Sequence, residues 1–366
     1  MRQPPERMRR LPEQYFMALL GRVSAAAAAD GEPLVDLGRG NPEVGPPRHV
    51  VEALQRAADR PDAQGYAPFS GLPALKEAIA ARYATVYGVT VDPAHEVAVV
   101  PGSKTALMEF ALVAVERGET ILLPDPGYAD YPSAVALASA RRASFTDFES
   151  ADGAALYLNY PTNPTAQAAP ANVFGDAVRW AQRTSAFVLH DFAYGDLVFD
   201  GRSPTSFLAT DGARDVGVEL FSMSKSYGMA GWRLGFVIGN AELVRRVEEL
   251  QDHLFAGAFR PVQEAGIAAL TGPQDSVEAR RATYERRRDV ALAALPGLDA
   301  RSEGTFFVWF RLPDGVTAES LLAEQRVVVA PGEGFGARGS GFARLSLAVT
   351  DEVLDAGLER LRRVPR

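Results

Sequence analysis

The sequence predicts an α/β protein built on a mainly parallel sheet with helices on both faces, plus a smaller α+β domain. Short apolar runs alternate with helical segments from residue 35 to residue 240, as in a parallel sheet whose strands are joined by helices. Chemically active side chains follow several of these runs, at the strand ends where such sheets bind ligands. The length of 366 residues suits two domains. We expect an N-terminal arm and helix (1–34) that packs with the small domain, a large domain (35–250) and a small domain (251–366).

Composition excludes several classes of function. The formal charge of −8 gives no basic surface for nucleic acid. No apolar run approaches the roughly 18 residues of a membrane helix, and the basic N-terminus lacks the apolar core of a secretory signal. The absence of cysteine excludes disulfides and thiolate metal sites, and the four histidines lack metal-ligand spacing. We therefore expect a cytoplasmic enzyme without a metal, a nucleic-acid partner or a membrane partner.

The predicted elements follow the apolar pattern in chain order. Strands of the large domain are predicted at 97–100, 120–123, 155–158, 186–189, 218–223 and 234–238, and strands of the small domain at 305–310, 327–329 and 343–349. Helices are predicted at 73–87, from 103 onward, as one or two helices within 241–270, and near 277–295. The glycines at 334–339 match the dinucleotide-binding pattern by letter. We reject that function because a strand, and not a helix, is predicted to follow them.

The segment 222–233 carries the most specific chemistry of the chain. Lys225 lies there among hydroxyls and small residues, and Arg233 follows eight positions later. A lysine amine condenses with a carbonyl, and an arginine fork beside the hydroxyls of Ser222 and Ser224 grips a phosphate. The chain has only three lysines among its 38 lysine and arginine residues, which weakens the alternative of a solvated surface lysine. These groups suit the aldehyde and phosphate ends of pyridoxal phosphate.

A second phosphate site is predicted after the strand at 97–100. Gly102, Ser103 and Lys104 open the next helix, with Ser103 as the expected N-cap. Free N–H groups and the helix dipole favour an anion at such a helix start. We assign Ser103 and Lys104 to the phosphate, a role with which ordinary helix capping is compatible.

The lysine segment resembles the signature of the class I/II aminotransferases, which are pyridoxal-phosphate enzymes of fold type I. The pattern is Ser-x-Ser-Lys, a spacer of small residues, and Gly-x-Arg. The resemblance covers nearly the whole chain. It implies that Lys225 holds the cofactor, and that Ser222, Ser224 and Arg233 belong to its binding site.

Three further segments resemble the family around the cofactor ring. Tyr128, after Pro-Gly, implies a ring that stacks on the pyridine, with a core aromatic as the alternative. Asn163, in Asn-Pro-Thr, implies a hydrogen bond to the phenolic oxygen. Ala166 replaces the usual glycine there, which puts the turn in doubt because alanine tolerates positive φ poorly. Asp191 and Tyr194 match Asp-x-x-Tyr. The aspartate would keep the pyridine nitrogen protonated, so that the ring draws electrons, and the tyrosine would bind the phenolic oxygen.

Substrate and subunit contacts are implied by the same resemblance. Gly40 matches a glycine whose N–H meets the substrate carboxylate, and Arg344 matches the arginine that grips it. A simple turn and a lone strand arginine are the alternatives. Tyr66 matches a tyrosine that reaches the cofactor phosphate of the other subunit, which implies a homodimer; a packed loop tyrosine is the alternative. His190 either supports its neighbour Asp191 or is simply packed.

The function implied by the resemblance is that of an aminotransferase in amino-acid metabolism. It would move an amino group between an L-amino acid and a 2-oxo acid by a ping-pong mechanism through Lys225, with Asp191 and Tyr194 completing the catalytic set. The chain resembles most the bacterial enzymes for methionine-like, aromatic or diaminopimelate-type substrates. A β- or γ-lyase on the same scaffold is the alternative, because a lyase would share nearly every cofactor residue.

Overall fold

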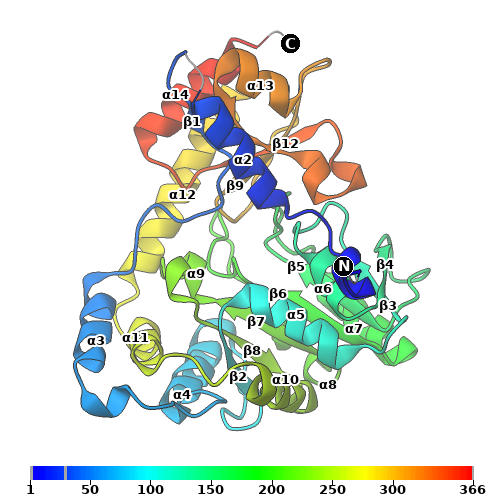
Figure 1. The fold of residues 1–366 in the computed structure, drawn as a ribbon, viewed down its shortest axis with the longest axis vertical. Coiled ribbons are helices and arrows are strands. Elements are labelled where there is room, and N and C mark those ends of the chain that lie inside the picture. The colour runs from blue at the N-terminus through cyan, green and yellow to red at the C-terminus, as the bar shows by residue number, and fades with distance from the viewer. Residues whose placement is uncertain (1–2, 29–30, 365–366) are drawn as a thin grey trace.

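The computed structural model describes residues 3–28 and 31–364 (Figure 1). Its largest sheet has seven strands in the order β2 (Val97–Val100), β8 (Gly235–Gly239), β7 (Gly217–Ser222), β6 (Phe187–Asp191), β5 (Ala155–Asn159), β3 (Thr120–Leu123) and β4 (Arg141–Ser144). Strand β8 runs antiparallel to both of its neighbours, and every other pair is parallel. The prediction of a mainly parallel sheet is confirmed.

Helices cover both faces of this sheet. One face packs against α5 (Ser103–Ala114), α6 (Tyr131–Leu137) and α10 (Ala241–Leu254). The other face packs against α4 (Pro73–Arg82), α7 (Val173–Thr184), α8 (Ala213–Val216) and α11 (Arg260–Thr271). Alternate residues of β2 serve the two cores, because Val97 and Val99 belong to one cluster and Ala98 and Val100 to the other. Burial on both faces explains why the strands other than the exposed edge strand β4 read as continuous apolar runs.

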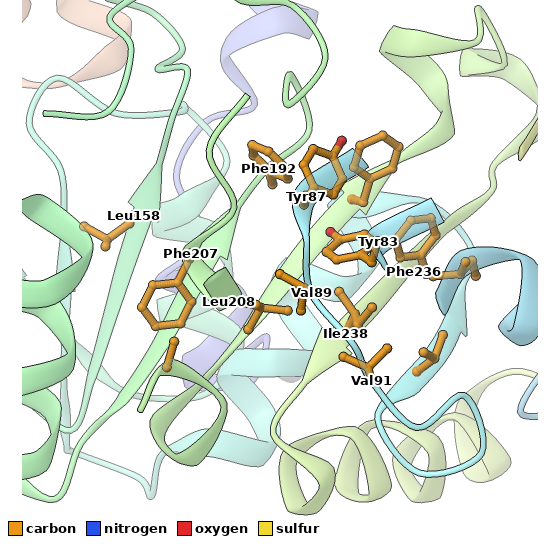
Figure 2. Close-up of a cluster of buried hydrophobic side chains, with 14 of the residues drawn as sticks. Tyr83, Tyr87, Val89, Val91, Leu158, Phe192, Phe207, Leu208, Phe236 and Ile238 are labelled. Atoms are coloured by element: carbon orange, nitrogen blue, oxygen red, sulfur yellow. The ribbon is translucent and has the colours of Figure 1, made fainter. Parts of the chain in front are cut away.

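The core beneath α4 is rich in aromatic rings (Figure 2). After α4 the chain continues as a π-helical turn, Tyr83–Tyr87, which ends at Gly88 in the left-handed region. The Tyr83 ring lies 6.0 Å from that of Phe236, and the Tyr87 ring lies 5.2 Å from that of Phe192. The predicted helix at 73–87 is therefore α4 followed by this turn.

The second body of the structure holds two small sheets. One has the order β11 (Ala330–Pro331), β12 (Phe342–Ser346), β9 (Phe307–Arg311), and the other pairs β1 (Val35–Asp36) with β10 (Val327–Val328). Helices α12 (Asp275–Ala294), α13 (Ala318–Gln325) and α14 (Asp351–Arg362) accompany them. Figure 1 shows this body above the large sheet, with α12 running between the two. The smaller α+β region is thus present.

The N-terminal helix packs on the small sheets. After the short helix α1 (Glu6–Arg9), helix α2 (Tyr15–Ala27) buries Leu19 and Val23 in a cluster with Trp309 and Val328. Residues 1–2 and 29–30 of the predicted arm lie outside the described residues. The three-part division of the chain stays a prediction. Strand β1, which falls in the predicted large domain, pairs with β10 of the small sheets. Helix α11, which falls in the predicted small domain, packs against α4 and against α3 (Arg48–Ala58) of the large domain.

In the described part of the chain, no helix combines the length and the apolarity that crossing a bilayer requires. The glycines at 334–339 form 3₁₀ turns over Gly332–Phe335 and Ala337–Gly339, and β12 follows them. This segment lacks the helix that a dinucleotide-binding loop would open.

Candidate active site

A cavity of about 660 Å³ lies between the large sheet and the small sheets. Its wall includes twelve of the thirteen residues that the sequence assigns to the site: Gly40, Ser103, Lys104, Tyr128, Asn163, Asp191, Tyr194, Ser222, Ser224, Lys225, Arg233 and Arg344. These residues come from strands, loops and helix starts that are far apart in the sequence. Tyr66 is the exception: it is 88% exposed and does not line the cavity.

Lys225 is held inside the cavity by a short helix. Helix α9 (Met223–Ser226) follows β7 directly, and Ser222 caps it by accepting a hydrogen bond from the Ser224 nitrogen at 3.2 Å. The Lys225 Nζ donates to the Gly40 carbonyl at 3.0 Å. Burial, together with the positive charges of Arg344 and Arg233, lowers the pKa of Lys225 to about 8. Roughly a tenth of such amines are neutral at pH 7, far more than for an ordinary lysine.

A cradle for an anion lies at the start of α5. Gly102, and not the predicted Ser103, is the N-cap residue, so that expectation is wrong. The reason is steric: Gly102 has φ 88°, and a Cβ there would lie 2.3 Å from the Nη2 atom of Arg233. Ser103 instead begins this twelve-residue helix, whose first N–H groups have no partner within the helix. Free N–H groups beside a guanidinium suit a phosphate.

Asp191 ends strand β6 as a buried carboxylate without an ion pair to any residue in 3–28 or 31–364. Its Oδ2 accepts from the Tyr131 hydroxyl at 2.8 Å, and its Oδ1 accepts from the Ala193 nitrogen at 3.2 Å. Burial raises the pKa of Asp191 above its usual value. A cation placed beside this carboxylate would favour its charged form. The sequence did not predict a role for Tyr131, because residue type alone does not distinguish it from the nearby Tyr128.

Arg344 is a buried guanidinium that forms no ion pair within the described residues; it is 1% exposed. Its Nη1 donates to Asn163 Oδ1 at 2.7 Å and its Nη2 to the Gly38 carbonyl at 3.2 Å, while its Nε has no partner. The guanidinium carbon lies 3.8 Å from the centre of the Phe307 ring. Because burying an unpaired charge is costly, this arrangement fits a receptor for an anionic group.

The loop that carries Asn163 contains the residue that departs from the family pattern. Ala166 has φ 53° and is fully buried. Its carbonyl accepts from the nitrogens of Glu303 at 2.7 Å and Gly304 at 3.1 Å, which ties the loop to the chain before β9. The turn therefore forms with alanine, since these contacts offset the strain of positive φ. Asn163 is anchored by its own nitrogen, which donates to Asn159 Oδ1 at 2.7 Å.

His190 does not contact the Asp191 side chain. Its Nδ1 lies 2.9 Å from Glu219 Oε2, and its Nε2 lies 3.1 Å from the Tyr160 carbonyl oxygen. Glu219 is fully buried and also accepts from the hydroxyls of Tyr83 and Ser206 and from the Phe207 nitrogen. Of the two alternatives for His190, the packed histidine matches the structure.

Two features of the cavity wall were not predicted from the sequence. Lys104 forms an ion pair with the buried Asp130 at 2.9 Å. Because the two residues are far apart in the sequence, no local sequence pattern indicates this pair. Helix α2 also lines the cavity, through Phe16, Leu19, Leu20 and Val23.

No group of three or more His, Cys, Asp or Glu residues in the described part of the chain is arranged to hold a metal.

Comparison with known proteins gives a consistent result. The model of the family described as aminotransferase class I and II matches residues 32–361. The L-glutamine–4-(methylsulfanyl)-2-oxobutanoate aminotransferase of Bacillus subtilis is 41% identical over 97% of this chain and 94% of that protein. The glutamate-pyruvate aminotransferase AlaC of Escherichia coli is 37% identical over 93% of this chain and 89% of its own length. The solved substrate-bound structure of BacF from Bacillus subtilis superposes with a TM-score of 0.93 at 36% identity, covering 99% of this chain and 98% of that one.

Proposed function

The chain belongs to the class I and II aminotransferase family and is a pyridoxal-phosphate-dependent aminotransferase, and on that premise we propose that Lys225 is its cofactor-bearing lysine. One observation carries the proposal. A half-buried lysine with a lowered pKa shares one cavity with an anion cradle, an unpaired carboxylate and an unpaired guanidinium. Each end of the cofactor and of an amino acid substrate therefore has a matching group.

The cavity fits the cofactor at three places. Gly102 leaves room beside Arg233 where a side chain would clash, and the free N–H groups of α5 supply further donors to a phosphate. Asp191 lacks a cationic partner in the described residues, as expected for a carboxylate that holds a protonated ring nitrogen. When bound, pyridoxal phosphate supplies an aldehyde carbon for amines and a ring that withdraws electrons.

Arg344 and Gly40 would hold the α-carboxylate shared by amino acids and 2-oxo acids. A side chain at position 40 would press on the Phe307 ring, because its Cβ would lie 3.2 Å from Phe307 and 3.7 Å from the Nη2 atom of Arg344. Bidentate pairing with a guanidinium fixes the direction in which the carboxylate enters. Since both substrates of an aminotransferase carry this group, one anchor serves both half-reactions.

Lys225 would also move the proton during the reaction. Its amine has a pKa of about 8, close to the pH at which a general base is most effective. With the cofactor and an amino acid bound, the Lys225 amine would be the group that takes the proton from the substrate Cα. Tyr194 is buried in the same wall, and its hydroxyl would bind the phenolic oxygen of the cofactor beside Asn163.

The half-reactions test this proposal. With an amino acid alone, each wild-type active site should release one equivalent of 2-oxo acid, and an added 2-oxo acid should restore the starting absorbance spectrum. The Lys225→Ala protein should fail at the first step. Continuous release of ammonia and pyruvate from a β-substituted amino acid would instead indicate the lyase. The names of the relatives support transamination.

We propose a homodimer in the cytoplasm as the state of the enzyme. Tyr66 is 88% exposed and its ring lies 6.3 Å from that of Phe69, while Leu254 and Phe259 on the nearby chain are also exposed. Exposed apolar groups of this kind are typical of an interface. Light scattering at micromolar concentration should give a dimer. Mixing Tyr66→Phe with Lys225→Ala protein should restore activity through hybrids that have one unaltered site, and a fully active monomer would contradict the proposal.

A further inference from the structure

The segment 36–40 connects the two groups that we assign to catalysis and substrate binding. Lys225 donates to the Gly40 carbonyl, and Arg344 donates to the Gly38 carbonyl. The two charged side chains of the segment, Asp36 and Arg39, line the same cavity. The wall nearest to the substrate carboxylate site therefore carries one negative and one positive charge.

These two charges are bound to each other. The Arg39 Nε lies 2.6 Å from Asp36 Oδ2. The other carboxylate oxygen of Asp36 accepts from the Gly38 nitrogen at 2.9 Å, which fixes the position of the aspartate. Asp36 keeps 21% of its side chain exposed and Arg39 keeps 62%, so the aspartate is the more enclosed partner and the arginine is the more exposed one.

The rest of this wall is apolar. Phe16, Leu19, Leu20 and Val23 of α2 line the cavity. The packing is close, since a Cβ at Gly38 would lie 3.6 Å from Leu19. A substrate side chain that extends past Arg344 toward α2 would therefore meet hydrocarbon and the Asp36–Arg39 pair.

The other cations of the described wall each have either a partner in the protein or an assigned role toward the cofactor or the substrate. Lys104 pairs with Asp130, and we assign Arg233 to the cofactor phosphate and Arg344 to the α-carboxylate. Arg39 is thus the one cation of the described wall that could reach a second, distal carboxylate, and Asp36 occupies it. An unpaired acidic side chain entering this region would also face the Asp36 carboxylate.

We propose that Asp36 and Arg39 determine the substrate specificity of this aminotransferase. Asp36 neutralises Arg39, so that the cavity selects amino acids and 2-oxo acids with neutral, largely apolar side chains against those with a second carboxylate. The selection uses repulsion and an occupied cation as well as apolar contact. This inference rests on the proposed role of Arg344 as the anchor of the α-carboxylate.

The test compares kcat/KM for methionine and for glutamate, with one common 2-oxo acid. Wild-type enzyme should prefer methionine. Asp36→Asn keeps an oxygen for the Gly38 nitrogen but frees Arg39, and it should raise the glutamate-to-methionine ratio about tenfold, which corresponds to roughly 1.4 kcal/mol. Arg39→Gln, an exposed change that leaves the Asp36 charge unopposed, should lower the ratio. The double variant should return it close to the wild-type value.

The matched control is Asp62→Asn, which removes one of the two acidic partners of Arg60 on the surface and away from the cavity. It should leave the ratio unchanged. A wild-type preference for glutamate, or an Asp36→Asn ratio equal to that of wild type in a protein of unchanged melting temperature, would overturn the inference. Failure of the proposed function looks different: Arg344→Lys would then leave kcat/KM intact for both amino acids.

Discussion

Replacement of Arg344 by lysine should damage substrate recognition without removing the positive charge. The guanidinium can offer two parallel hydrogen bonds to the α-carboxylate, whereas an ammonium offers one in that direction. A charge-assisted hydrogen bond contributes about 1.5–3 kcal/mol. The stacking of Arg344 on Phe307, at 3.8 Å, adds about 0.5–2 kcal/mol that the lysine would largely lose.

The sum of about 2–5 kcal/mol corresponds to a fall in kcat/KM of roughly 30- to 5,000-fold. Steady-state kinetics with an amino acid and with its amide separate the cause. The amide lacks the carboxylate charge, so wild type and Arg344→Lys should turn it over equally poorly. The cofactor content of the purified proteins should be equal, since Arg344 is assigned to the substrate alone.

The matched control is Arg311→Lys. Arg311 lies on β9 opposite Phe342 of β12, and its guanidinium carbon is 4.4 Å from the centre of that ring, but it does not line the cavity. This variant should keep kcat/KM within about twofold of wild type, because it loses the same kind of stacking outside the site. A kcat/KM of Arg344→Lys within threefold of wild type would refute the assignment of the carboxylate anchor.

Three further predictions concern the cofactor and the core. Asp191→Asn should retain bound cofactor but lower kcat about 10²- to 10⁴-fold, because a neutral amide no longer holds a proton on the ring nitrogen; an unchanged kcat, measured at saturating amino acid, would contradict this. The rate of cofactor attachment to the apoenzyme should increase about tenfold per pH unit up to about pH 8 and then level off, since the reactive amine of Lys225 is the neutral form. A rate, measured by stopped-flow absorbance, that keeps increasing up to pH 10 would show an ordinary lysine. Glu219→Gln should lower the free energy of unfolding in urea by about 2–4 kcal/mol, because an amide turns one buried acceptor into a donor that faces the Tyr83 and Ser206 hydroxyls. A loss below 0.5 kcal/mol would argue against the hydrogen-bond network around Glu219 as a source of stability.

Six of the seven strands of the large sheet were predictable because their burial is nearly complete, whereas the edge strand β4 is exposed along its length and was not predicted. Strands β2 and β3 have the predicted bounds of 97–100 and 120–123. Strand β6 extends two residues past the predicted apolar run, to Asp191, because its backbone pairing with β7 continues beyond the last apolar side chain. Apolar runs thus locate a buried parallel strand well but do not mark its end.

The site was predictable as a set of residue types but not as a network. The N-cap at Gly102 depends on Arg233, and the pairing of Lys104 depends on Asp130. Neither contact leaves a local pattern, because each joins residues that only the folded sheet brings together. The cavity-lining role of α2 is hidden for the same reason: its apolar spacing predicts burial, and only its docking on Trp309 shows what it borders.

Lys225 is the lysine that we propose to bear the cofactor. Borohydride reduction of the purified, cofactor-loaded enzyme followed by peptide mass spectrometry tests it most directly, because the chain offers only Lys76 and Lys104 as other lysines. Lys76 is buried in an ion pair with Glu248, and Lys104 is paired with Asp130. One cofactor per chain should be found on the peptide that contains Lys225. Labelling of Lys104 or Lys76, with the Lys225 peptide unmodified, would contradict it.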